Sequence, residues 1–203
     1  FREYADLFRN TSFLLVMMAL AAAACAGTPL LHFLPGFVTE HRDVPLEQAG
    51  LEIGAIAALA GTFGTLAGGW MCDRLARRTR KAHFLLGAAA YLSAFPCILL
   101  GLYAPSKLMH LAGLSLGIFM VFGALTVLNT LVTGINRPEI RAMAFSVLIF
   151  SMHLLGDTFS PPFFGALIDK FGYEKGFFYM TLPFAVSAFA CLIGLTTVEA
   201  DLG

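Results

Sequence analysis

The sequence is dominated by long apolar stretches that are almost free of charged residues. Six stretches of this kind are present, at 10–39, 53–72, 83–106, 107–136, 142–168 and 176–198. A helix needs about 20 mainly apolar residues to cross the hydrocarbon core of a bilayer, and every stretch reaches that length. We therefore predict an all-α membrane protein whose six transmembrane helices lie near 11–38, 48–71, 82–103, 107–134, 140–168 and 175–198.

The composition agrees with a lipid environment and excludes several functions. Charged residues make up 13% of the chain and hydrophobic residues 58%, whereas about 25% of the residues in a soluble domain are charged. Thirteen basic residues balance thirteen acidic ones, so no positive excess is available to bind a nucleic acid. The four cysteines lie far apart, without metal-ligand spacing. We expect no cofactor and no metal.

The basic residues predict how the helices are oriented. If the N-terminus is cytoplasmic, nine Lys and Arg residues face the cytoplasm and four face the outside, which agrees with the positive-inside rule. Both ends would then be cytoplasmic, in a multi-pass protein of a bacterial inner membrane. Because the chain starts at Phe1 rather than Met, we expect it to be a piece of a longer protein.

A short motif occurs twice, 96 residues apart. Residues 69–76 read G-x-x-x-D-R-x-A, and residues 165–172 read G-x-x-x-D-K-x-G. Three predicted helices separate the copies, so they would lie on opposite faces of the membrane. This arrangement is typical of the 3+3 inverted repeat that builds each six-helix half of a major facilitator transporter, although a motif this short can also recur by chance.

The stretch GGWMCDRLARRTRK, at 68–81, resembles the cytoplasmic signature loop of the major facilitator superfamily, G-x-x-x-D-R-x-G-R-R, and departs from it at Ala76. The resemblance implies a conformational latch in which Asp73 meets the start of a neighbouring helix, where the helix dipole favours a carboxylate. The expected latch residues are Gly69, Asp73, Arg74, Arg77, Arg78 and Arg141. The alternative is a basic anchor for anionic lipid, which we favour for Arg80 and Lys81.

The fifth predicted helix carries the polar groups that are hardest to explain as packing. On a helical wheel, Ser146, His153, Asp157 and Ser160 fall within an arc of about 60°. His153 and Asp157 are four residues apart and can share a proton near neutral pH, so we predict that they couple transport to protons. The alternative is a hydrogen bond between helices. Because Pro161 and Pro162 lack N–H groups, we also predict a kink there.

The stretch at 136–172 is similar to the corresponding region of Spinster-family transporters, whose eleventh helix carries H-L-L-G-D followed by S-P. These letters stand here at 153–157 and 160–161. The resemblance implies that the whole chain is the C-terminal half of such a transporter, helices seven to twelve, with the N-terminal half as its partner. It also implies an amphiphilic substrate such as a lysolipid or a sphingolipid-like molecule, together with proton coupling.

Further polar residues are predicted to line a substrate cavity. Thr126, Asn129, Thr130 and Thr133 form a stripe along the fourth helix, and the first helix offers Thr28 and His32 near its outer end, beside Phe33. Ser146 and Ser160 complete the predicted cavity set.

We therefore predict a secondary transporter that works by alternating access. A drug or organic-anion antiporter is the closest alternative. A membrane-embedded lipid-modifying enzyme with His153 as its base is a second alternative, although the sequence contains no nucleophile elbow or metal-ligand cluster. A channel or an assembly subunit is a third.

Overall fold

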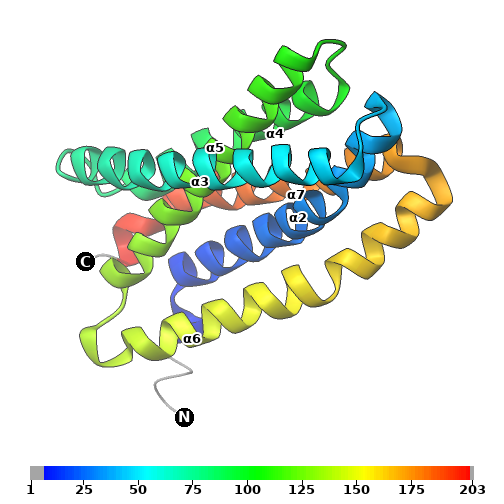
Figure 1. Ribbon diagram of the computed structural model, residues 1–203. Coiled ribbons are helices and arrows are strands. Elements are labelled where there is room, and N and C mark those ends of the chain that lie inside the picture. Colours follow the sequence, from blue (N-terminus) through cyan, green and yellow to red (C-terminus); the bar gives the residue numbers. More distant parts are fainter. Residues whose placement is uncertain (1–6, 202–203) are drawn as a thin grey trace.

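The computed structural model describes residues 7–201, and every long element in that range is a helix (Figure 1). This confirms the predicted all-α class. The elements are α2 (Thr11–Arg42), α3 (Leu46–Ala76), α4 (Ala82–Tyr103), α5 (Lys107–Ile135), a 3₁₀ turn η1 (Pro138–Ile140), α6 (Arg141–Met152), a π-helix η2 (His153–Thr158) and α7 (Ser160–Asp201).

The last helical segment turns back on itself at Gly172. Five segments of the described chain are long and apolar enough to cross a membrane, and the last, Pro138–Val198, has 61 residues. At 1.5 Å per residue it would measure about 90 Å, three times the thickness of the hydrocarbon core. Gly172 has φ 79° and ψ 168°, a conformation that essentially only glycine adopts. The bend divides this segment into two antiparallel arms (Figure 1).

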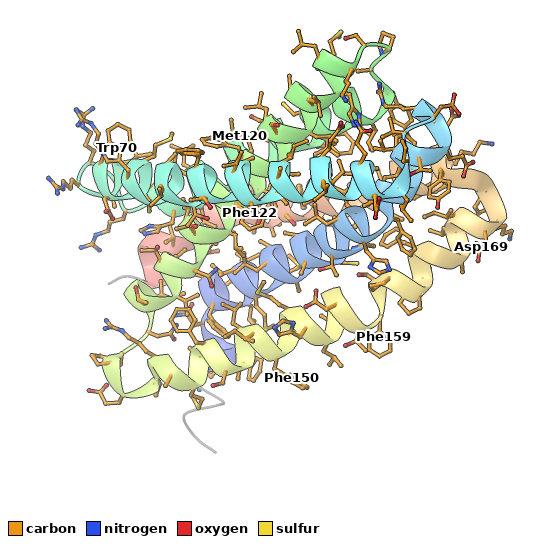
Figure 2. The ribbon with its side chains drawn as sticks, viewed as in Figure 1. Trp70, Met120, Phe122, Phe150, Phe159 and Asp169 are labelled. Atoms are coloured by element: carbon orange, nitrogen blue, oxygen red, sulfur yellow. The ribbon has the colours of Figure 1, made fainter. Side chains whose placement is uncertain are left out.

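The joints between helices alternate between the two ends of the bundle. The α3–α4 joint and the joint between α5 and α6 lie at one end, whereas the α2–α3 joint and the Gly172 bend lie at the other (Figure 1). The two copies of the repeated motif consequently lie at opposite ends, as the positions of Trp70 and Asp169 show (Figure 2).

Glycines allow α3 and α5 to touch through their backbones. A Cβ atom added at Gly64 would lie 3.0 Å from the carbonyl carbon of Phe119, and one added at Gly68 would lie 2.6 Å from the carbonyl oxygen of Gly123. A side chain at either position would therefore force the helices apart. Such small-residue contacts are a common way for membrane helices to pack, and here they fix α3 against α5.

Helix α2 packs along the C-terminal arm of α7 and forms the core with it. The Ser187 hydroxyl donates to the carbonyl of Ala19 over 2.8 Å, which adds a polar tie to this apolar interface. Large side chains are fully buried around it, among them Phe13, Phe37, Phe177 and Phe184. This packing holds one side of α2, and another part of α2 meets η2.

Candidate functional site

Three polar side chains meet where α2 passes η2. The hydroxyl of Thr28 on α2 donates to Oδ1 of Asp157 over 2.5 Å, and Nδ1 of His153 contacts Oδ2 of the same carboxylate. The side chain of His153 is 67% exposed and that of Asp157 is 36% exposed. One carboxylate oxygen of Asp157 therefore links η2 to α2, and the other oxygen contacts the solvent-accessible imidazole of His153.

Gly156 makes this meeting possible. A Cβ atom at Gly156 would clash with the Cβ of Ala24 and would also lie 3.0 Å from the Ala24 carbonyl carbon and 3.1 Å from the nitrogen of Cys25. Because both of those partners are backbone atoms, no side-chain rotation could relieve the contact. The missing side chain of Gly156 thus lets η2 approach α2 closely enough for the next residue, Asp157, to reach Thr28.

The backbone is irregular on both sides of the contact. Residues 153–158 form a π-helix, a rare form that is frequent at functional sites. Pro161 follows it and has no N–H group for the carbonyl of Asp157. On α2, Pro29 is inside the helix and likewise leaves the carbonyl of Cys25 without its helical donor. The π-helix ends at Thr158, shortly before Pro161, and the kink predicted at the two prolines stays a prediction.

An open apolar groove of about 620 Å³ adjoins this contact. It runs between α2, η2 and α7, and its walls include Met17, Met18, Cys25, Leu155 and Pro183. Cys25 lies one turn before Thr28 on α2, and Leu155 lies two residues before Asp157. The groove thus borders the same stretches of α2 and η2 that make the polar contact, while the side chains of Thr28, His153 and Asp157 are not part of its lining.

The predicted single stripe on the fifth helix is not what the structure shows. Ser160 is only 2% exposed, and its hydroxyl contacts the carbonyl of Gly156. Ser146 is exposed, and its hydroxyl donates to Ala142 over 2.9 Å. The helical wheel assumed 3.6 residues per turn throughout, whereas the π-helix between the two serines has a wider turn and rotates Ser160 into the bundle.

The polar stripe on α5 is divided between different surroundings. All four side chains of the stripe donate hydrogen bonds to backbone carbonyls of α5 itself. The four donors are Thr126, Asn129, Thr130 and Thr133. The methyl group of Thr126 faces α3, because a Cβ added at Gly69 would lie 3.8 Å from it. Thr130 is exposed, and the other three are partly buried. No hydrogen bond connects this stripe to Asp157 within the described residues.

The predicted outer residues of α2 also separate. His32 is exposed, and its ring stands edge-on to that of Phe33 with the centroids 5.0 Å apart. Phe33 itself packs toward α7, where a Cβ at Gly165 would lie 3.4 Å from its ring. Of this predicted group, Thr28 alone meets the Asp157 carboxylate in the described structure.

The predicted latch residues gather at the end of α3. Asp73, Arg74, Arg77 and Arg78 are all exposed there, and the Arg74 guanidinium lies 5.8 Å from the centre of the Trp70 ring. Arg141, which was predicted to belong to the same latch, donates from Nε to the carbonyl of Asn136 over 3.2 Å. In the described part of the chain, neither a hydrogen bond nor an ion pair connects Asp73 with Arg141.

The family model of the Major Facilitator Superfamily matches residues 1–154, three quarters of the chain. The chain belongs to this superfamily. Among solved structures, a bacterial homologue of the human lysosomal transporter Spinster, in its inward-facing and occupied conformation, is similar with a TM-score of 0.81. The identity is 19%, and the match covers 97% of this chain and 51% of that one.

Curated relatives include transporters of two kinds. A probable sphingolipid transporter of Arabidopsis thaliana, spinster homolog 3, is 28% identical over 61% of this chain and 24% of its own length. An MFS-type efflux pump of Mycolicibacterium smegmatis is 26% identical over 84% of this chain and 40% of its own length. The chain thus spans less than half the length of these superfamily members.

Two features of this superfamily member were not anticipated from its sequence. Thr28 was predicted to line a cavity, and its bond to Asp157 was not foreseen because 129 residues separate the two. His110 was not singled out, yet it is 1% exposed, and its Nδ1 is bonded to the carbonyl of Gly101 over 2.7 Å. The sequence did contain a signal for the first feature. Gly156 directly precedes the carboxylate of Asp157 in a predicted membrane helix, and a glycine at such a place lets another helix come close.

Proposed function

We propose that the chain forms one six-helix half of a secondary transporter that moves an amphiphilic, lipid-like substrate by alternating access and couples this movement to protons. The observation that carries the proposal is the Asp157 carboxylate, held between Thr28 of α2 and His153 of η2. An ionisable group inside a membrane-spanning segment is costly to place and is therefore a sign of function.

The geometry gives protonation a mechanical consequence. An ionised carboxylate only accepts hydrogen bonds, and Asp157 accepts one from Thr28. When the carboxyl takes up a proton, it gains a donor of its own, and its bond from the Thr28 hydroxyl weakens. The contact between α2 and η2 would then depend on whether Asp157 carries a proton. His153 is largely exposed, so it would carry the proton between an aqueous cavity and Asp157.

The neighbouring groove supports an amphiphilic substrate. A molecule with an apolar tail could lie against Met17, Met18 and Leu155 and direct its polar head toward Asp157 and Thr28. Methionine is well suited to such a wall, because its flexible side chain adapts to different tails. The Arabidopsis relatives named as probable sphingolipid transporters favour the same class of substrate.

A drug efflux antiporter is the second candidate, and the efflux pump of Mycolicibacterium smegmatis favours it. An apolar groove beside a carboxylate also suits a cationic amphiphilic drug. Competition distinguishes the two: lysolipids should inhibit uptake of a labelled lipid substrate strongly, whereas cationic dyes should compete better if the protein is a drug antiporter. An enzymatic role for His153 would require turnover of a lipid that stays in its leaflet.

We also propose that the end of the bundle carrying Arg74 and Arg78 is cytoplasmic, with both termini on that side, in a bacterial inner membrane. The N-terminal six-helix half of the same protein would supply the partner surface for the latch. This agrees with the exposure of Asp73. The proposed 3+3 inverted repeat relates this loop to the stretch at 165–172, at the opposite end.

The decisive experiment measures transport by the complete protein in sealed vesicles under an imposed pH gradient. Asp157→Asn should abolish the dependence of flux on the gradient while the protein still folds, because asparagine can still accept the bond from Thr28. Glu47→Gln, which removes an exposed charge at the start of α3, is the matched control and should behave as the wild type. Flux in Asp157→Asn that still follows the pH gradient would refute the coupling role.

A further inference from the structure

A second groove, separate from the one beside Asp157, runs between α3 and α4 toward the basic end of the bundle. It consists of two hollows of about 210 Å³ and 260 Å³. Met71 and Leu86 line both hollows, so the two hollows adjoin at these side chains. The inner part of the groove is apolar and includes Gly68, Ala89 and Ala90.

The outer end of this groove has a different chemistry. Trp70, Arg74 and Arg78 line it, and all three are exposed. Trp70 and Arg74 lie four residues apart on one edge of α3, and Arg78 follows in the turn after Ala76. Trp70 stands toward that end of the helix (Figure 2). Tryptophan favours the boundary between the apolar core and the headgroups, and neighbouring arginines provide the planar donors that suit a phosphate.

We infer that this groove is a binding site for one anionic phospholipid of the leaflet at the basic end. The phosphate would lie between Arg74 and Arg78, and an acyl chain would follow Met71 and Leu86 toward Ala89. The order of the surfaces along the groove identifies the occupant. The two cations would face the headgroup of a lipid, the aromatic ring its glycerol region, and the apolar lining its tail.

The local charge supports an anionic headgroup. Between Asp73 and Lys81 the chain has five basic residues and one acidic residue, and a basic surface beside a membrane attracts anionic lipids. The Arg74 guanidinium lies 5.8 Å from the Trp70 ring centre, so the cation and the aromatic ring stand together at the groove edge. This site differs from the proposed substrate groove, and its occupant would be a resident lipid that need not be transported.

Trp70 provides a direct probe, because it is the only tryptophan among the 203 residues. The complete protein, with any tryptophan outside this chain replaced by phenylalanine, is reconstituted in phosphatidylcholine vesicles. Bromine-labelled phosphatidylglycerol or bromine-labelled phosphatidylcholine is then added in increasing mole fraction, and quenching of Trp70 fluorescence is recorded. We expect half-maximal quenching at a several-fold lower mole fraction of the anionic lipid.

Variants separate a defined site from general attraction to the surface. Arg74→Gln and Arg78→Gln should each reduce the preference for the anionic lipid about fivefold. Arg77→Gln removes an equal charge at the same end but does not line the groove, and it should leave the preference nearly unchanged. Arg74→Lys, which keeps the charge but loses the planar donors, should retain only part of the preference.

A second pair of variants tests the tail. Ala89→Phe would fill the apolar part of the groove and should weaken quenching by both brominated lipids, whereas Ala185→Phe, on an exposed position of α7, should not. Three results would overturn the inference. They are equal quenching by the two lipids, equal loss of preference in Arg77→Gln and Arg74→Gln, and no quenching of Trp70 by either lipid. Since the signal is bound lipid, these outcomes are independent of whether transport or the latch works as proposed.

Discussion

Substituting Gly156 with alanine tests whether the Asp157 site depends on the close approach of η2 to α2. The added methyl group would clash with Ala24 and lie 3.1 Å from the backbone nitrogen of Cys25. Overpacking of this kind costs about 1–3 kcal/mol. Taking about 2 kcal/mol, the Tm of a domain of this size falls by roughly 4–8 °C. As η2 moves away from α2, the bond from Thr28 to Asp157 should lengthen.

The assay combines thermal unfolding in detergent with transport in vesicles under a pH gradient. Gly156→Ala should lose stability and also lose gradient-driven flux. Gly27→Ala is the matched control, because Gly27 lies beside Thr28 and an added Cβ would meet nothing within 4 Å. This control should gain up to about 1 kcal/mol from its better helix propensity. If Gly156→Ala is as stable and as active as Gly27→Ala, the contact does not position Asp157.

Three further perturbations follow from the same geometry. Thr28→Val keeps the shape but removes the donor to Asp157; it should cost about 1–3 kcal/mol in thermal unfolding and reduce coupled flux, whereas Thr28→Ser should restore both. Gly172→Ala should cost about 1–3 kcal/mol because of its backbone angles, and Gly134→Ala, where a Cβ meets nothing within 4 Å, should not; equal losses would contradict the role of the bend. Arg74→Ala should shift the balance of inward-open and outward-open states, measured by cysteine labelling from each side, and an unchanged labelling pattern would remove Arg74 from the latch.

Hydropathy was a sound guide to the helices because the bilayer itself requires long apolar segments. Every backbone group in the hydrocarbon core must be bonded internally, so a long uncharged stretch has few structures open to it. The pairing of His153 with Asp157 was also predictable, since both lie on one element four residues apart. Both successful predictions concern features that are set within a single helix or by the lipid around it.

Contacts between helices were harder to predict from the sequence. The wheel placed Ser146 and Ser160 on one face, and the π-helix between them turned Ser160 into the bundle, where it is 2% exposed. The predicted stripe on α5 consists of side chains that bond to their own helix, as Thr126 does to Phe122 over 3.0 Å. A polar residue in an apolar segment can satisfy itself locally, so its presence does not reveal which way it faces.

The two kinds of helix contact in this chain suggest where movement begins. Helices α3 and α5 meet through backbone atoms at Gly64 and Gly68, so no titratable side chain takes part in these two contacts. The contact of α2 with η2 is also close at Gly156, but it is completed by the hydrogen bond from Thr28 to Asp157, whose strength changes when a proton binds. Backbone hydrogen bonding is interrupted on both sides of this contact by prolines, so η2 can change its winding at a smaller cost than a regular helix. Under the proposed coupling, a proton arriving at Asp157 would act at a junction that can respond to it.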